Sequence, residues 1–293
     1  MASYQSKVFN VLLRLVNKKD FLKKRLVKGT IHQYSSPWPT GRIIHRNKVI
    51  AYLLNGHHVF TIKPKNKGST SHILYFHGGA YVQSFTRVHW SFLAQLIEDT
   101  NCTVTAPDYP LAPKHDYRDT FAMCLKVYER LGTEVKTEHL ILMGDSSGGG
   151  LALAFAQELK NRNLPQPKQI ILLSPWLDLT LSNPAIKELA EQDPFTGIEG
   201  LLMAGSAYAG SAPKNLSLLS PINGSLEGLG KISIFVGAKE IMVADARKLK
   251  LKAESLGIPL NYWEYSDMVH VWMLLRLPES RAAQKQITDL IVC

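Results

Sequence analysis

Cysteine is scarce in this chain of 293 residues, and its three copies form neither a C-x-x-C pair nor an even set: Cys102, Cys124 and Cys293. This pattern argues against a disulfide framework and favours a reducing compartment. The chain also lacks H-E-x-x-H and any other metal-ligand cluster, so we expect neither a metal nor a cofactor.

Long apolar runs are missing as well. None reaches the roughly 18 residues that cross a bilayer, and we find no internal repeat and no low-complexity segment. Near the N-terminus Arg14 interrupts the apolar residues and no small-residue cleavage site follows. We therefore expect no transmembrane segment, no signal peptide and a cytoplasmic location.

Acidic residues are fewer than basic ones, which gives a net charge of +10, and the first 30 residues hold +7 of it. The same segment carries an apolar stripe at helical spacing, ended by Gly29; its members are Val8, Leu12, Leu15, Leu22 and Leu26. Three interpretations compete: a cap helix, a membrane-surface helix and a nucleic-acid arm. We favour the cap, because such a stripe normally packs on its own protein. No nucleic-acid-binding module accompanies the charge, so we expect no nucleic acid partner, and a peripheral membrane contact stays open.

Short β-type runs alternate with helical stretches along the rest of the chain. This alternation predicts an α/β fold with a mostly parallel sheet and helices on both faces. Eight strands are expected: Val49 to Leu53, His58 to Ile62, Ile73 to Phe76, Thr103 to Ala106, Leu140 to Met143, Ile170 to Leu173, Ile232 to Val236 and Leu260 to Tyr265. Helices are expected over Arg118 to Leu131, Ser147 to Asn161, Val243 to Leu256 and Pro278 to Ile291.

A G-x-S-x-G sequence, residues 144–148, lies between one expected strand and the helix that follows it. In this context the motif is typical of a nucleophile elbow, a tight turn that lifts a serine hydroxyl above the sheet. Ser146 has glycines two positions before and two after it, whereas Ser147 has Asp145 two positions before it. The motif therefore indicates that Ser146 is the nucleophile, and Asp145 is expected to hold the turn or a neighbouring loop.

A second loop suits the same chemistry. His77, Gly78, Gly79 and Ala80 follow the strand that ends at Phe76. Backbone N–H groups of Gly78, Gly79 and Ala80, together with that of Ser147, are expected to stabilise an oxyanion. Tyr81, next in the chain, is a weaker candidate for the substrate pocket.

The general base follows from chain order. Nine of the ten histidines precede Ser146, and only His270 follows it. Because the order in this kind of site is serine, acid, histidine, the base is predicted to be His270.

These motifs resemble those of the hormone-sensitive-lipase-like group of bacterial carboxylesterases, which have the α/β-hydrolase fold. The resemblance runs from about residue 72 to the C-terminus, and its further segments are 108–113, 174–180 and 237–245. The chain departs from the pattern at Ala80, where a third glycine is common, and at Pro110 and Lys114, where arginine and glutamate are usual. Glu240 stands where the group usually has the aspartate of its catalytic triad, so the resemblance makes Glu240 the acid. Asp245, in the first turn of the next helix, is expected to be structural.

The resemblance also implies an organisation and a function. We expect residues 1–45 to form a basic helical cap segment, 46–293 the catalytic domain, and residues around 178–213 a second cap piece. The expected activity is hydrolysis of short- to medium-chain carboxylic esters, small-molecule substrates, through an acyl-enzyme. An amidase or arylformamidase is the alternative, ahead of a non-catalytic ligand-binding or peripheral membrane protein. The sequence also leaves a homo-oligomer open.

Overall fold

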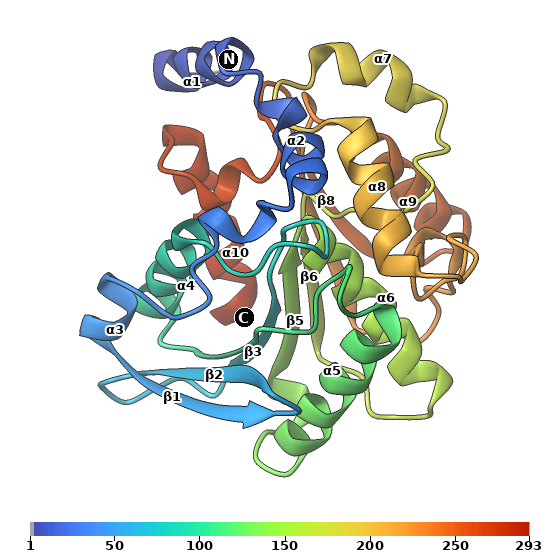
Figure 1. Ribbon diagram of the computed structural model, residues 1–293. Helices are drawn as coiled ribbons and strands as arrows, with labels where there is room; N and C mark the ends of the chain where they lie inside the picture. Colours follow the sequence, from blue (N-terminus) through green and yellow to red (C-terminus); the bar gives the residue numbers. More distant parts are fainter. Residues whose placement is uncertain (1–2, 293) are drawn as a thin grey trace.

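The computed structural model describes residues 3–292 and contains one eight-stranded sheet (Figure 1). Its spatial order is β1-β2-β4-β3-β5-β6-β7-β8. β2 pairs antiparallel with both β1 and β4, and every other neighbouring pair is parallel. All eight expected strands are confirmed: β1 Asn47–Leu54, β2 His57–Pro64, β3 His72–Phe76, β4 Thr103–Pro107, β5 Leu140–Asp145, β6 Gln169–Leu173, β7 Lys231–Gly237 and β8 Leu260–Tyr265.

Helices cover both faces of this sheet, as the alternation of elements predicts. Successive side chains of a strand point to opposite faces, so Leu74 and Phe76 enter one apolar core while Ile73 and Tyr75 enter the other. The first core is completed by α5 Tyr117–Gly132, α6 Ser147–Asn161 and α9 Val243–Ser255. The second is completed by α4 Arg87–Thr100 and α10 Pro278–Val292.

The N-terminal segment is not the single helix that the stripe predicts. It forms α1 Tyr4–Leu15, a 3-10 turn η1 Lys18–Asp20 and α2 Phe21–Lys28. Asn17, in the left-handed region at φ 48°, separates the two helices. Gly29 ends α2 in the left-handed conformation, as expected. The break turns the two halves of the stripe toward different surroundings.

The two halves of the stripe differ in burial. Leu22 and Leu26 of α2 pack against the core. On α1, in contrast, the side chain that enters the core is Leu13, with Phe9 beside it, and Ser6 donates to Glu279 at the start of α10 at 2.6 Å. The expectation that the whole stripe packs on its own protein is wrong for α1, because its apolar outer face remains exposed: Tyr4, Val8, Val11, Leu12 and Leu15.

Two more helices lie at the same end of the molecule as α2, and the second of them packs against it (Figure 1). They are α7 Ala185–Gln192 and α8 Ile198–Ala209, both inside the segment expected to hold a second cap piece. Lys23 of α2 forms an ion pair with Glu199 of α8, and Arg14 of α1 donates to the backbone oxygen of Gln192 at 2.7 Å. The N-terminal helices and the inserted helices are thus joined to one another.

The chain between α2 and β1 leads back to the sheet. It forms η2 Ile31–Tyr34 and α3 Arg42–Arg46. Ser36 accepts a hydrogen bond from the Trp90 indole of α4 at 2.6 Å, and Ile43 is fully buried. Cys102 and Cys124 are buried and unpaired, whereas Cys293 lies outside the described residues.

Short turns complete the chain. They are η3 Thr137–His139, η4 Pro221–Asn223 and η5 Trp272–Leu274. Within residues 3–292, no helix combines the length and the apolar character that a bilayer span requires.

Candidate active site

The turn from β5 to α6 holds Ser146 above the end of the sheet. Its φ of 52° is unusual for a side chain with a Cβ, and strain of this kind is concentrated at functional sites. A Cβ on Gly144 would overlap the backbone oxygen of Gly148, and one on Gly148 would overlap the backbone oxygen of Phe76. Both glycines of the motif are therefore required by close backbone contacts.

Three side chains distant in sequence form one hydrogen-bonded series at this turn. The Nε2 atom of His270 lies 2.8 Å from the hydroxyl oxygen of Ser146, and its Nδ1 atom contacts the Oε2 atom of Glu240. Glu240 is fully buried, while Ser146 retains 9% of its surface, so the hydroxyl is reachable from outside. The arrangement is that of a nucleophile, a base and an orienting acid.

The carboxylate of Glu240 is held in one orientation. Its Oε1 atom accepts hydrogen bonds from the hydroxyl of Ser174 and from the backbone N–H of Gly237, each 2.7 Å long. Ser174 also accepts from the N–H of Val271 at 3.1 Å, which ties the acid to the loop of His270. In the sequence, Ser174 stands out only as part of segment 174–180 of the family resemblance. No local pattern reveals its bond to a residue 66 positions away.

The second carboxylate that follows β7, that of Asp245, does not contact His270. It lies in the first turn of α9 and accepts a hydrogen bond from Asn183 at 3.0 Å. Burial raises the pKa of Asp245 to about 6.

The environment of His270 favours its protonated form. Burial by itself lowers the pKa of an imidazole, but the charge and hydrogen bond of Glu240 outweigh that effect, and Asp193 contributes in the same direction. The pKa of His270 is therefore above its ordinary value. Once such an imidazole has accepted a proton, the carboxylate of Glu240 stabilises its charged form.

The expected oxyanion loop lies beside Ser146, with one change in its donors. The N–H of Gly78 already donates to Asp145 Oδ1 at 2.9 Å, so it is not available to a substrate. Gly79 and Ala80, both with positive φ, remain as candidate donors, together with the N–H of Ser147 at the start of α6. The expectation for Gly78 was wrong because its amide is used to fix the loop.

Asp145 links this loop to the elbow, as expected of it. It also accepts from the Tyr75 hydroxyl at 2.5 Å, and its second oxygen lies 3.4 Å from His89. Burial alone would raise the pKa of Asp145, but the charge of His89 and the hydrogen bonds of His89, Tyr75 and Gly78 outweigh it, so that pKa is lowered. An ionised carboxylate therefore holds the loop and the elbow together.

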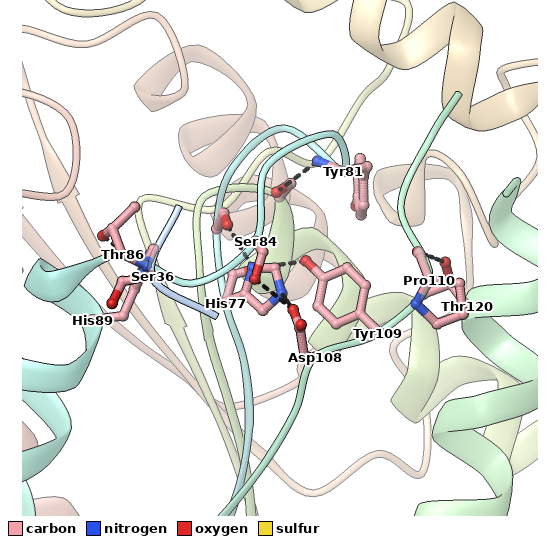
Figure 2. A network of polar contacts seen from close by, with 12 residues as sticks. Ser36, His77, Tyr81, Ser84, Thr86, His89, Asp108, Tyr109, Pro110 and Thr120 are labelled. Atoms are coloured by element: carbon pink, nitrogen blue, oxygen red, sulfur yellow. Dashed lines mark hydrogen bonds and ion pairs between the residues drawn. The ribbon is translucent and has the colours of Figure 1, made fainter. Parts of the chain in front are cut away.

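A second network supports the loop from the other side (Figure 2). His77 stacks on Tyr109 with ring centroids 4.2 Å apart, and the Tyr109 hydroxyl donates to the backbone oxygen of His77 at 2.5 Å. Asp108 accepts from Ser84 at 2.6 Å and lies 3.7 Å from His77. Burial lowers the pKa of His77 to about 3, so this ring is neutral and its role is to position Gly78.

Tyr81 does not line the cavity above Ser146. Its ring is 2% exposed and stacks on Tyr208 of α8 at a centroid distance of 3.8 Å. The expectation of a pocket residue was therefore wrong, because the inserted helix α8 covers the ring.

The hydroxyl of Ser146 opens into a cavity of about 670 Å³ between the sheet and the N-terminal helices. Its walls come from the oxyanion loop, the His270 loop, the start of α4 and the segment before α8. Its outer rim comes from η1 and α2, which contribute Lys18, Lys19, Leu22 and Arg25.

Known proteins are similar to this chain in sequence and in fold. A family model described as the alpha/beta hydrolase fold matches residues 73–274. An esterase of Acinetobacter venetianus is 30% identical over 229 residues, which cover 75% of this chain and 74% of that protein.

Solved structures extend the match over the whole chain. A hormone-sensitive lipase from a metagenome library is 26% identical with a TM-score of 0.86, covering 100% of this chain and 99% of the other. The esterase EstE5, from a crystal soaked with p-nitrophenyl butyrate, is also 26% identical with a TM-score of 0.86, covering 99% and 98%. The N-terminal helices therefore have counterparts in relatives.

Proposed function

This chain belongs to the α/β-hydrolase fold family and is a carboxylic ester hydrolase, and from that premise we propose that Ser146, His270 and Glu240 are its catalytic triad. The observation that carries the proposal is the 2.8 Å approach of His270 Nε2 to the Ser146 hydroxyl, with Glu240 on the opposite ring nitrogen. The identity of the acid rests on the same contact, because Asp245 bonds to Asn183 instead.

The reaction proceeds through an acyl-enzyme. The Ser146 oxygen attacks the ester carbonyl while His270 Nε2 takes its proton, and Glu240 stabilises the imidazolium that forms. The N–H groups of Gly79, Ala80 and Ser147 stabilise the oxyanion. His270 then gives the proton to the departing alcohol. Water, deprotonated by the same histidine, then attacks the acyl carbonyl. The bond between the acyl carbon and the Ser146 oxygen breaks, the acid leaves, and His270 returns the proton to the Ser146 oxygen.

The substrates are esters of short- to medium-chain acids, with acyl chains of about two to eight carbons. The cavity above Ser146 supports this range, because 670 Å³ is in the middle of the usual size for small-molecule sites. The relative soaked with p-nitrophenyl butyrate agrees with it. Emulsified long-chain triglyceride is expected to be a poor substrate.

The cap is formed by two segments of the chain. The first is the N-terminal segment up to about residue 35, rather than 45, because Ser36 and Ile43 pack on the catalytic core. The second is the expected piece around residues 178–213, with α7 and α8. The ion pair between Lys23 and Glu199 supports their action as one unit.

A panel of 4-nitrophenyl esters from acetyl to palmitoyl, with an anilide and a formanilide beside them, tests this function. We expect the highest kcat/KM below ten carbons and esters preferred over both amides. Ser146→Ala should abolish turnover and labelling by a fluorophosphonate, while the neighbouring control Ser147→Ala should keep both. Labelling that survives in the Ser146 variant would refute the triad. A preference for the formanilide would instead support an arylformamidase.

The outer face of α1 favours a second function, contact with an anionic membrane surface. Its exposed apolar side chains form one stripe, because positions 4, 8, 11 and 15 fall on the same side of a helix. Lys7 and Lys19 lie nearby and are exposed. An apolar stripe accompanied by cations suits a helix that lies in the headgroup region of a bilayer.

Sedimentation with vesicles containing phosphatidylglycerol tests this contact. The triple variant Val8→Ser, Leu12→Ser, Leu15→Ser should lose binding, and high salt should weaken binding of the parent protein. Leu251→Ser, which changes an equally exposed leucine on α9, is the matched control. A parent protein that does not sediment with these vesicles would refute the membrane contact.

A further inference from the structure

The rim of the cavity above Ser146 has an unbalanced charge. Its lysine and arginine side chains, among the described residues, come from η1, α2 and the first residue of α4: Lys18, Lys19, Arg25 and Arg87. Among the described residues, Asp145 contributes the only carboxylate of the lining, and it is already bonded to Tyr75 and Gly78 and faces His89. The lining of the entrance therefore contains more cationic than anionic side chains.

Lys18 is the most deeply placed of these cations. Its Nζ atom lies 4.6 Å from the ring centroid of Phe195 and 5.3 Å from that of Phe21. The Phe195 ring is in turn 5.6 Å from the ring of His270. Added together, the distances through Phe195 place the ammonium no more than about 10 Å from the imidazole.

The segment that carries the Phe195 ring beside Lys18 is held by hydrogen bonds to Asp193. Asp193 accepts the backbone N–H groups of Phe195 at 2.7 Å and Thr196 at 2.9 Å, and its other oxygen accepts that of Ile241 at 3.0 Å. This bonding holds the Phe195 ring between Lys18 and His270. The carboxylate of Asp193 is occupied by these amides and does not line the cavity.

Lys18 has no carboxylate partner among the described residues, although a recessed lysine usually has one. Among residues 3–292, no carboxylate lies within ion-pair distance of Lys18, and the same is true of Lys19 and Arg87. Burial, with a smaller effect from the charge of Arg25, lowers the pKa of Lys18 to about 8. A buried ammonium that has aromatic rings beside it but no carboxylate among the described residues is suited to an anion from outside.

We propose that Lys18, assisted by Arg25 and Arg87, binds an anionic oxygen group, a carboxylate or phosphate, carried by the ester substrate at a distance from its carbonyl. This inference rests on the proposed function and narrows its substrate class to esters with a negative charge in the acyl or the alcohol part. A charge pair in partly screened surroundings is expected to raise kcat/KM about tenfold.

Matched pairs of substrates test the proposal on both sides of the ester. Mono-4-nitrophenyl adipate is compared with its methyl ester, which removes the charge from the acyl part. 3-Acetoxybenzoate is compared with methyl 3-acetoxybenzoate, which removes it from the alcohol part. A phosphate arm compares 3-acetoxyphenyl phosphate with its neutral dimethyl ester. The readout is the ratio of kcat/KM between the anionic and the neutral member of a pair.

We expect a ratio of about ten in at least one pair, falling to about one in Lys18→Met and partly restored in Lys18→Arg. Arg87→Met, at an exposed position, should lower the same ratio and provides a second variant should Lys18→Met not fold. Lys28→Met removes an exposed lysine of α2 that does not line this cavity, and should leave the ratio unchanged. High salt should lower the ratio in the parent protein.

Two results would overturn the proposal: a ratio near one in every pair, or a ratio that survives in both Lys18→Met and Arg87→Met. Neither would affect the proposed esterase function, which depends on turnover of the neutral esters by Ser146. Loss of that turnover in the parent protein would instead refute the esterase function itself.

Discussion

Replacement of Glu240 by glutamine should disable the base while leaving the fold intact. In the parent protein Oε1 accepts from Ser174 and from the Gly237 N–H, so the amide oxygen of a glutamine must take that position. Its NH₂ group then faces Nδ1 of His270, which must accept rather than donate. The proton of the neutral ring is thereby placed on Nε2, the atom that has to receive the proton of Ser146.

The expected loss follows from this change of tautomer together with the loss of the negative charge. Wrong tautomers in triads of this geometry lower kcat by about ten-thousand-fold, which corresponds to about 5 kcal/mol of transition-state stabilisation. The assay is steady-state hydrolysis of 4-nitrophenyl butyrate, with circular dichroism and thermal unfolding to establish that the variant is folded.

A double variant tests the orientation argument itself. Ser174→Ala removes one of the two donors that lock the amide, so Glu240→Gln with Ser174→Ala should be more active than Glu240→Gln alone. Glu240→Asp keeps the charge but withdraws it, and should cost at most about a hundredfold. A Glu240→Gln enzyme that keeps more than a tenth of its kcat/KM would refute the assignment of the acid.

Two further predictions concern titration. The kcat/KM for a neutral ester should rise with pH with a midpoint above 6.5, because His270 must be neutral to act as a base and its pKa is raised; a midpoint below 6.5 would contradict this. Asp245→Asn should leave turnover within a few-fold and stabilise the protein by roughly 1 kcal/mol at pH 8 but not at pH 4, measured by urea unfolding. The sign follows because the folded pKa, about 6, exceeds the ordinary 3.8, so stability from this group falls as pH rises between those values; equal effects at both pH values would refute it.

Features that depend on neighbouring residues could be predicted from the sequence. The elbow is such a feature, because Gly144 and Gly148 mark backbone contacts made within one turn. The strands follow from runs of apolar residues, and their ends agree with the structure to within two residues. The candidate base His270 followed from chain order, since it is the only histidine after Ser146.

Features that depend on distant partners could not be predicted. The N–H of Gly78 was expected to face the substrate, but its acceptor is Asp145, 67 positions later. Tyr81 was expected in the pocket, yet the ring that covers it, Tyr208, belongs to a helix whose docking no local pattern specifies. In both cases the contact that decides the role of the residue lies far along the chain.

The N-terminal segment shows how such a contact can reverse an interpretation. Helical periodicity reports that α1 has apolar faces, but both the face of Phe9 and Leu13 and that of Val8 and Leu15 are apolar, and only packing distinguishes them. The positive charge divides in the same way. Lys23 of α2 pairs with Glu199 of α8, whereas other cations of the segment line the cavity or face outward. The charge of +7 therefore has no single partner, and each cation must be assigned by the surface on which it lies.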